Sequence, residues 1–444
     1  MRACQRHFFA LVTGLTCVLA RDARADRAVI TVGDVDTLYE AVNDPGNAGA
    51  VVHVRQGLYV LDATVPPFGR LVLQPGMDLV GENQYLFVDG RPAPRDAAGE
   101  TFADPPSETI LDGTALVAGP PGPAGTPPII LANADNAVRN LTVRTSATAV
   151  AGIGVNHSAR GTGSVASITE CILEAGAGGG RRGVQIAHDN DDAVGASSTI
   201  TIARNVIRHH MGAFGFGVQA VRALTHDDQI VLTMSGNVVY DNAFGLFLPN
   251  VLGTRHGSTV AFSSNNEYRD NFVGVVLVGG RDLAVGQGGT QKNLVTLTSS
   301  NDIIVHNVDL PEFGGGTGVI AVAALRDGPD PASVSNGNVV SLTLLGTRFL
   351  ASSGIQNGAS DGSSRSDVQV FGSIGSYTPY QTAGANNRTQ VLMSGLRESP
   401  VPGEAVQVFS LDSDIGERNN LVEWIGGIDA LVTNNPLIPI IVSP

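Results

Sequence analysis

Side chains that could perform acid–base chemistry are concentrated between residues 181 and 282. Asp191 and Asp192 are adjacent and follow a short apolar stretch, and His210 comes one repeat further along the chain. A glycosidase needs one carboxyl group to protonate the leaving oxygen and a second to attack or to activate water. Asp191, Asp192 and His210 are therefore candidate catalytic residues.

Arginines close to the same stretches suit a different reaction. A polysaccharide lyase needs a cation that neutralises the uronate carboxylate and a basic group that takes the adjacent proton. Arg182, Arg269 and Arg281 are candidates for this chemistry by their location.

Three further aspartates could contribute to a metal site. Asp189, Asp227 and Asp228 supply carboxylate oxygens, and Ca²⁺ takes six to eight oxygen ligands. Their spacing matches no calcium-binding loop. The sequence therefore requires no cofactor, and Ca²⁺ is the ion that these residues could hold.

The elements that must position these residues repeat three times between Ser198 and Gly280. The copies read STITIARNVIRHHMGAFGFGVQAV, IVLTMSGNVVYDNAFGLFLPNV and STVAFSSNNEYRDNFVGVVLVGG. Each copy has an alternating apolar stretch, an asparagine, a second polar residue and then a glycine that opens another apolar stretch. Repeats of this length are typical of a solenoid, in which each unit buries its apolar face against the next.

The aligned polar residues of the repeats predict an internal stack. The spacing between successive copies varies while the core of each copy stays constant, as in a parallel β-helix whose turns lengthen freely. Leucine-rich and helical repeats are excluded because neither fixed leucine spacing nor a 3.6-residue period appears. We expect each stacked side chain to bond to the backbone or to the next coil; these residues are Asn205, Asn237, Asn266 and Asp302.

The first coils carry a family resemblance. VVHVRQGLYVLDATV followed by LVLQPGMDLVGEN resembles the opening coils of pectin-lyase-like right-handed parallel β-helix proteins, and the repeat pattern extends the resemblance over most of residues 50–370. It implies an all-β fold, a right-handed single-stranded parallel β-helix with a short N-terminal capping helix. No catalytic family within the superfamily is matched.

In this superfamily, active sites usually lie on the face formed by the strand that follows the aligned glycine. Side chains alternate along a strand, so the residue after each glycine should point inward and the next one outward. The glycines taken as equivalent are Gly183, Gly217, Gly245, Gly274, Gly318 and Gly354. The outward set contains Gln185, Gln219 and Phe247 but no charged residue. With Tyr240 and Tyr268, in the preceding turns, these are the candidate substrate-binding residues.

One segment is similar to the polygalacturonases. In NDDAVGASSTITIARNVIRHHMGAFGFG, Asp191 and Asp192 would match the acids of that family and His210 its histidine. Three departures count against this: the aspartates follow their strand instead of preceding it, the upstream N-T-D element is missing, and FGLFLPN replaces an R-I-K.

The chain divides into four parts. Residues 1–25 resemble a signal peptide with cleavage after Ala25, residues 26–50 form an N-terminal cap with a helix over 34–49, residues 51–370 form the β-helix, and residues 371–444 form the last coils and a C-terminal cap. No membrane-spanning apolar stretch follows the leader, so a secreted or periplasmic protein is expected.

Charge and composition limit the partners. The net charge of −14 counts against nucleic acid, which requires a basic surface. One tryptophan and 5% aromatic residues leave little material for sugar-stacking platforms. Cys171 is the single cysteine after the leader, which rules out an intramolecular disulfide.

These observations favour an exported protein that binds or processes an extracellular polysaccharide along a groove on one β-face, with a uronate-containing polysaccharide and lyase-like chemistry as one option. A non-catalytic structural, adhesion or assembly solenoid is the alternative, and a polygalacturonase-like glycoside hydrolase is the second. The sequence leaves open whether the protein is an enzyme. The expected partner is a glycan, with no nucleic acid and no transmembrane segment, and the expected state is a monomer or a homotrimer.

Overall fold

The computed structural model describes twenty stretches of the chain. They are residues 27–83, 87–88, 91–92, 108–116, 128–133, 135–145, 152–158, 162–176, 181–189, 194–211, 215–282, 289–305, 317–326, 335–350, 366–375, 385–394, 406–409, 421–425, 431–433 and 440–443.

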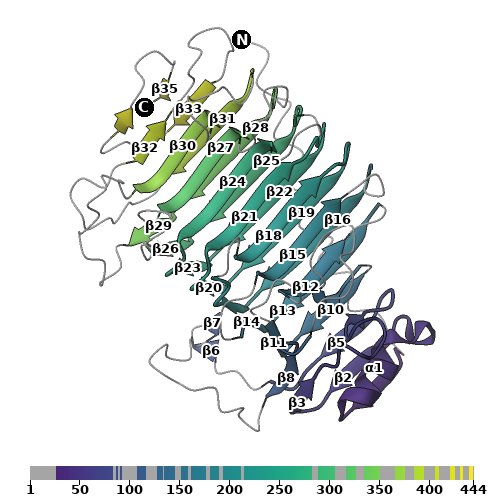
Figure 1. Ribbon diagram of the computed structural model, residues 1–444. Helices are drawn as coiled ribbons and strands as arrows, with labels where there is room; N and C mark the ends of the chain where they lie inside the picture. The colour runs from purple at the N-terminus through teal and green to yellow at the C-terminus, as the bar shows by residue number, and fades with distance from the viewer. Residues whose placement is uncertain are drawn as a thin grey trace.

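Three parallel sheets run the length of the molecule, and each coil of the chain contributes a strand to them in turn. The three rows of strands are visible side by side along the long axis (Figure 1). This arrangement confirms the predicted right-handed parallel β-helix. Outside it, β6 (Phe87–Val88) and β7 (Arg91–Pro92) form a two-stranded antiparallel ribbon.

The bounds of the strands follow the sheet order. Sheet A contains β1 (Val29–Val32), β2 (Val51–Val54), β5 (Asp78–Val80), β10 (Asn136–Arg139), β13 (Ser164–Thr169), β16 (Ser197–Ala203), β19 (Gln229–Ser235), β22 (Ser258–Ser264), β25 (Leu294–Ser300), β28 (Val339–Leu345), β31 (Arg388–Ser394), β33 (Leu421–Ile425) and β35 (Ile440–Ser443). Sheet B contains β3 (Gly57–Val60), β8 (Thr109–Asp112), β11 (Thr142–Thr145), β14 (Ile172–Ala175), β17 (Val206–Arg208), β20 (Val238–Tyr240), β23 (Glu267–Arg269), β26 (Ile303–Val305) and β29 (Arg348–Leu350). Sheet C contains β4 (Leu71–Val72), β9 (Pro128–Leu131), β12 (Ile153–Ser158), β15 (Arg182–Asp189), β18 (Phe216–Ala223), β21 (Phe244–Val251), β24 (Val273–Asp282), β27 (Thr317–Arg326), β30 (Ser366–Gly375), β32 (Val406–Phe409) and β34 (Leu431–Thr433).

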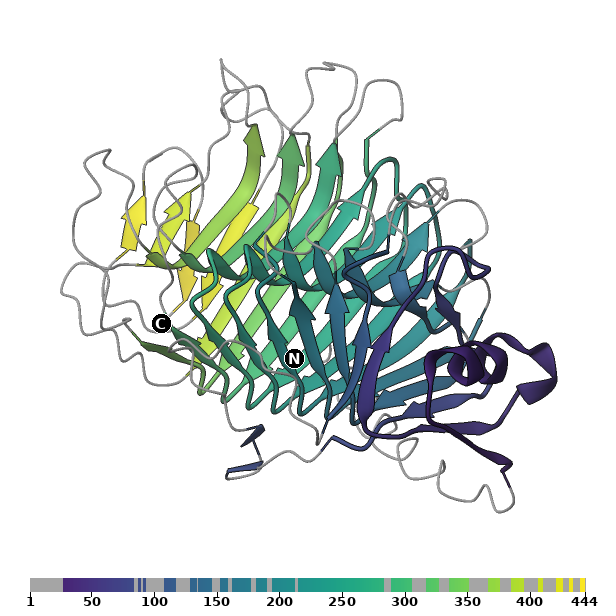
Figure 2. The same ribbon diagram turned by 60° about the horizontal axis from the view of Figure 1, so that its bottom comes forward.

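One helix covers the N-terminal end of the coils. Asp34 caps the N-terminus of helix α1 (Val35–Asn43), because its side chain accepts a hydrogen bond from the Thr37 backbone N–H. A 3₁₀ turn (Pro45–Asn47) follows the helix. The helix packs against β1, β2 and β4 through its apolar face, which includes Leu38 (Figures 1 and 2). The predicted capping helix is therefore confirmed. Within the part of the chain that the structure describes, no helix has the length and apolar character needed to cross a membrane.

The predicted polar ladder lies inside the coils. The Asn237 side-chain oxygen accepts hydrogen bonds from the backbone N–H and side-chain N–H of Asn205, at 2.9 and 3.0 Å. The Asn266 side-chain oxygen accepts the same two hydrogen bonds from Asn237, and Asp302 Oδ1 accepts them from Asn266. These bonds satisfy polar groups at turns that would otherwise be buried without partners. The stack of asparagines is confirmed.

Two further internal ladders run parallel to this one. His210, Asn242 and Asn271 form the second, in which each backbone N–H donates to the next asparagine side chain. Asn293, Asn338 and Asn387 form the third in the same way.

The aligned glycines allow a local break in the strand alternation. A Cβ on Gly217 would lie 2.7 Å from the Gly245 carbonyl oxygen and 2.8 Å from Val239 Cγ1 in the core. Gly217 and the next residue, Val218, therefore both face the interior. As a result, Phe216 and Gln219 share the outer face, although strict alternation would separate them.

The predicted inward and outward sets are confirmed for the first five coils, but the sixth alignment is wrong. Val319 of β27 pairs with Val368 of β30, so Asp367 occupies the position predicted for Gly354. Gly354 lies outside the described residues. More residues separate β29 from β30 than separate β26 from β27 in the preceding coil. The repeat pattern does not determine the number of residues between strands, so it could not predict this alignment.

Candidate binding site on the outer face of sheet C

A row of side-chain amides crosses the outer face of sheet C. Asn156 on β12 pairs in register with Gln185 on β15, which pairs with Gln219 on β18. All three residues are at least nine-tenths buried. The oxygens Asn156 Oδ1 and Gln219 Oε1 have no hydrogen-bond partner. Two acceptors are thus held on this face without donors.

Arg182 stands at the start of β15, next to this row. Its Nη1 donates a hydrogen bond to Gln185 Oε1 over 3.0 Å, while its buried Nε has no acceptor. Burial, together with the smaller effect of the neighbouring Arg181 charge, lowers the pKa of Arg182 to about 10. The guanidinium remains a cation at neutral pH, so the face carries a positive charge that is partly desolvated.

Four phenylalanines adjoin Arg182 on the same face. Phe216 and Phe247 stack with centroids 4.8 Å apart and an interplanar angle of 11°. Phe244 stacks on both at 5.3 and 5.7 Å, and Phe272 meets Phe244 edge-on at 6.3 Å. The Arg182 guanidinium carbon lies 5.8 Å from the Phe216 ring centroid. The face therefore combines an aromatic platform, a cation and unpaired amide oxygens.

Several residues of this site were not predicted from the sequence. Low overall aromatic content predicted too little stacking material, yet four of the phenylalanines gather at one place. The signal was the phenylalanine before two of the aligned glycines, Phe216 and Phe244, but strict alternation would place these residues inside. Asn156 could have been found by extending the register one coil towards the N-terminus.

Two predicted site residues lie in the interior, so their predicted roles are wrong. His210 is fully buried in the second ladder, with Nε2 3.4 Å from the Leu173 carbonyl oxygen. Burial lowers its pKa to about 3, which the bond to that carbonyl only partly offsets. Tyr268 points into the core and shares a 3.0 Å hydrogen bond with Ser263, and burial raises its pKa. Neither side chain can reach a substrate. The polygalacturonase-like hypothesis is weakened because His210 was the histidine that it required.

Asp228 is also internal, which contradicts its assignment as a metal ligand. Its carboxylate accepts hydrogen bonds from Arg222 and, at 2.8 Å, from His188 Nδ1. Burial alone would raise the pKa of Asp228, but these two partners outweigh burial and hold the pKa below its ordinary value. His188 Nε2 lies 2.8 Å from Ser198 Oγ. This Asp–His–Ser chain has the order of a catalytic triad, but its side chains are buried within the coils.

Tyr240 and Arg269 lie on the outer face of sheet B instead of beside the amides. Arg208 bridges Glu174 and the Tyr240 hydroxyl, with both distances 2.8 Å. The Arg269 guanidinium carbon lies 4.7 Å over the Tyr240 ring, and its Nε is 3.4 Å from Glu267 Oε1. This ladder of alternating partners stabilises sheet B, so the predicted grouping of Tyr240 and Arg269 with Gln185 is wrong.

The remaining predicted residues are dispersed. Asp189 ends β15 opposite Ala223, and Arg281 pairs with Leu325 after a bulge in β24. Asp227 is exposed beside His226 Nδ1 at 2.9 Å. Among the residues that the structure describes, no three His, Cys, Asp or Glu side chains are grouped so that they could hold a metal ion. Asp191 and Asp192 lie outside the described residues.

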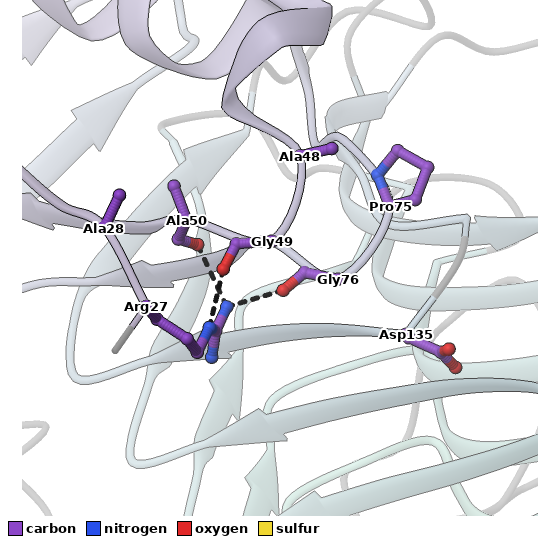
Figure 3. Close-up of a pocket in the computed structure, with 8 residues that line it drawn as sticks. All are labelled: Arg27, Ala28, Ala48, Gly49, Ala50, Pro75, Gly76 and Asp135. Atoms are coloured by element: carbon purple, nitrogen blue, oxygen red, sulfur yellow. Dashed lines mark hydrogen bonds between the residues drawn. The ribbon is translucent and has the colours of Figure 1, made fainter. Parts of the chain in front are cut away.

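A separate pocket of about 470 Å³ lies at the N-terminal end of sheet A (Figure 3). The Arg27 guanidinium donates to the carbonyl oxygens of Gly49, Ala50 and Gly76 and pairs with Asp78. These bonds join the segments that begin β1, β2 and β5. The pocket therefore surrounds a cation that the protein itself satisfies, and it offers little for a ligand.

Comparison with known proteins finds solved structures that align with this chain at low sequence identity. No family model matches the chain, and no curated protein matches it. Among solved structures, the A-module of a mannuronan C-5 epimerase from Azotobacter vinelandii aligns at 14% identity with a TM-score of 0.40, covering 92% of this chain and 94% of that one. A periplasmic alginate epimerase aligns at 14% identity and a TM-score of 0.37, covering 93% and 82%. A DFA-IIIase from Arthrobacter chlorophenolicus A6, in complex with GF2, aligns at 11% identity and 0.37, covering 95% and 92%. Function must therefore be argued from the residues of this chain.

Proposed function

We propose that the outer face of sheet C binds a polysaccharide, with an acidic sugar unit placed at Arg182. The observation that carries the proposal is the set of three buried polar atoms without partners, Asn156 Oδ1, Arg182 Nε and Gln219 Oε1, beside stacked phenylalanine rings. A buried polar group without a partner costs about 1–3 kcal/mol. A ligand that satisfies these atoms recovers that free energy.

The donor and acceptor types specify the ligand. The two amide oxygens require donors, which sugar hydroxyl groups supply. Arg182 Nε requires an acceptor, and a carboxylate is the acceptor that makes the strongest hydrogen bonds with a guanidinium. Phe216 and Phe247 are almost completely buried, but the Phe244 and Phe272 rings of the same cluster are only partly buried and offer an apolar surface for the C–H face of a sugar ring. A glycan that contains uronate units meets all of these requirements.

Binding is better supported than cleavage. No carboxylate lies beside Gln185, Gln219 or Phe247 among the outward residues that the structure describes. Catalysis would depend on Asp191 and Asp192, with Arg182 or Arg281 as the cation, and the double change of Asp191 and Asp192 to Asn should then abolish release of unsaturated products and reducing ends. Export through the leader at residues 1–25 would place the site among extracellular glycans.

Affinity gel electrophoresis tests the proposal directly. The wild-type protein should be retarded in gels that contain uronate polysaccharides, and Gln219→Leu should weaken that retardation because it removes an acceptor at nearly constant volume. Gln56→Leu makes the same change at an exposed position near the N-terminus and should leave retardation unchanged. Absence of retardation by every acidic and neutral polysaccharide tested would contradict the proposal.

A further inference from the structure

The outer face of sheet A differs from the other two faces because it is both exposed and uncharged. None of the six strands β13, β16, β19, β22, β25 and β28 contains a charged residue, in a chain with 27 basic and 41 acidic residues. Sheet B carries the ladder of Arg208 and Glu174, and most outward residues of sheet C are buried. We call the outward side chains of these six strands the sheet A face.

The central column of the sheet A face consists of hydroxyl-bearing residues with one interruption. The residues in register are Ser167, Thr201, Thr233, Phe262, Thr298 and Thr343. Phe262 is 44% exposed although it stands between two threonines. Leu294 and Leu345 on the same face are 37% and 38% exposed. These three side chains lie at the middle of β22, the start of β25 and the end of β28, so apolar groups are exposed at separate points across an otherwise uncharged face.

We propose that the sheet A face docks a second copy of this chain. Two copies with a net charge of −14 repel one another over most of their surfaces, and a face without charge is where they can approach. A basic partner would require acidic residues here, and an acidic partner, nucleic acid or an anionic membrane would require basic ones. The sheet A face has neither, whereas the same face on another copy is matched to it in charge and flatness.

The size of the face suits a dimer. With β31 and β33 included, eight strands at about 4.8 Å and seven residues at about 3.3 Å give a plane of about 34 by 23 Å, or about 800 Å². A standard interface buries about 800 Å² on each partner. Arg388 on β31 is neutralised by Glu423 on β33, so the extension adds no net charge.

A two-fold arrangement places one residue at its centre. A dimer of identical copies uses the same patch on both partners. Phe262 belongs to the fourth of the eight strands, so it lies near the middle of the patch, where aromatic anchors carry most of the binding energy. The flanking Thr233 and Thr298 supply methyl groups and hydroxyls around the ring, and the ion pair of Arg204 with Glu170 provides a polar rim.

Sedimentation equilibrium of the purified protein tests this inference. We expect a reversible dimer, weakened at least tenfold by Thr298→Arg, which places like charges on opposing copies. Phe262→Thr, which continues the neighbouring threonine column, should also weaken it. Leu58→Arg changes a residue of similar exposure, 46%, on sheet B and should leave the dimer intact. An unchanged circular dichroism spectrum confirms that each variant folds. A wild-type monomer at about 0.1 mM, or a dimer indifferent to both sheet A changes, would overturn the inference.

Discussion

Arg182 donates a hydrogen bond from Nη1 to Gln185 Oε1 over 3.0 Å, and the Nε of the same guanidinium has no acceptor. One edge of the cation is therefore fixed to the protein, while the Nε at the other edge is buried without a partner. A guanidinium held in this way can present its remaining N–H groups to a carboxylate with little loss of conformational freedom. In the binding site proposed above, this geometry would favour acidic sugars over neutral ones.

The first prediction concerns charge selectivity. Arg182→Gln should reduce the affinity for a uronate oligosaccharide about tenfold to a hundredfold, because a hydrogen bond to a charged group contributes about 1.5–3 kcal/mol. Affinity for a neutral oligosaccharide should change much less. Isothermal titration calorimetry measures both, with Arg55→Gln as a control at an exposed arginine. Equal losses for the acidic and the neutral ligand would show that Arg182 does not read charge.

The second prediction concerns the buried ion pair. Asp228→Asn removes the charge that balances Arg222, which is completely buried, and should lower the free energy of unfolding by about 3–5 kcal/mol. The adjacent Asp227→Asn changes an exposed side chain and should stay within about 0.5 kcal/mol of wild type. Urea denaturation compares the two variants. Similar stability of both would mean that the Asp228 network contributes little to the fold.

The third prediction concerns pH. The folded state holds the pKa of His210 at about 3, below the unfolded value of about 6.5, so folding favours the neutral ring. The stability due to this residue is complete above pH 6.5 and declines by about 1.4 kcal/mol per pH unit as the pH falls towards 3. His157, whose pKa burial lowers to about 4, adds to the effect.

His210→Asn provides the test because asparagines occupy the same ladder position in the next two coils. The variant should fold, and its stability should decline less steeply between pH 6.5 and 4 than that of wild type. Thermal denaturation across this range gives the two slopes. Identical slopes would show that His210 does not titrate on unfolding.

The fourth prediction concerns the glycine column. Gly217→Ala places a Cβ 2.7 Å from the Gly245 carbonyl oxygen and should destabilise the fold by about 1–3 kcal/mol. Gly33→Ala is a matched control, because the atom nearest to its Cβ would be Arg55 Cδ at 4.0 Å and its backbone is unstrained. Urea denaturation of both variants should separate them clearly. If Gly217→Ala left the free energy of unfolding unchanged, the coils would have to be able to move apart at this position.

Sequence patterns predicted the fold well because stacking constrains every coil in the same way. The Asn205 ladder and the inward Val184 and Val218 depend on a repeated register, which alternation and spacing reveal, and the capping helix is marked by its own apolar face and stop residues. The site was predicted only in part. The positions of Gln185, Gln219 and Phe247 follow from the register of the strands. Phe216 reaches the same face because the glycine that follows it has no side chain, and a simple alternation rule ignores this effect.

The polar turns were harder to predict because a polar residue next to a strand can turn either way. Arg208 and His210 lie two residues apart in one coil, yet His210 joins an internal ladder with Asn242 and Arg208 joins an external one with Tyr240. Asp228 was predicted as a metal ligand, but it pairs with Arg222 inside the coils. Pairing of this kind is decided by residues distant in the sequence, which a repeat pattern does not report.

We expect a glycan to lie over the phenylalanine cluster on the outer face of sheet C, where Phe244 and Phe272 are only partly buried. A crystal structure of the protein with a uronate oligosaccharide tests it most directly. The account predicts a sugar ring stacked on these phenylalanines, with its carboxylate within hydrogen-bond distance of Arg182 Nε and hydroxyls on Asn156 Oδ1 and Gln219 Oε1. A glycan bound on sheet B or sheet A, with the sheet C face empty, would contradict the account.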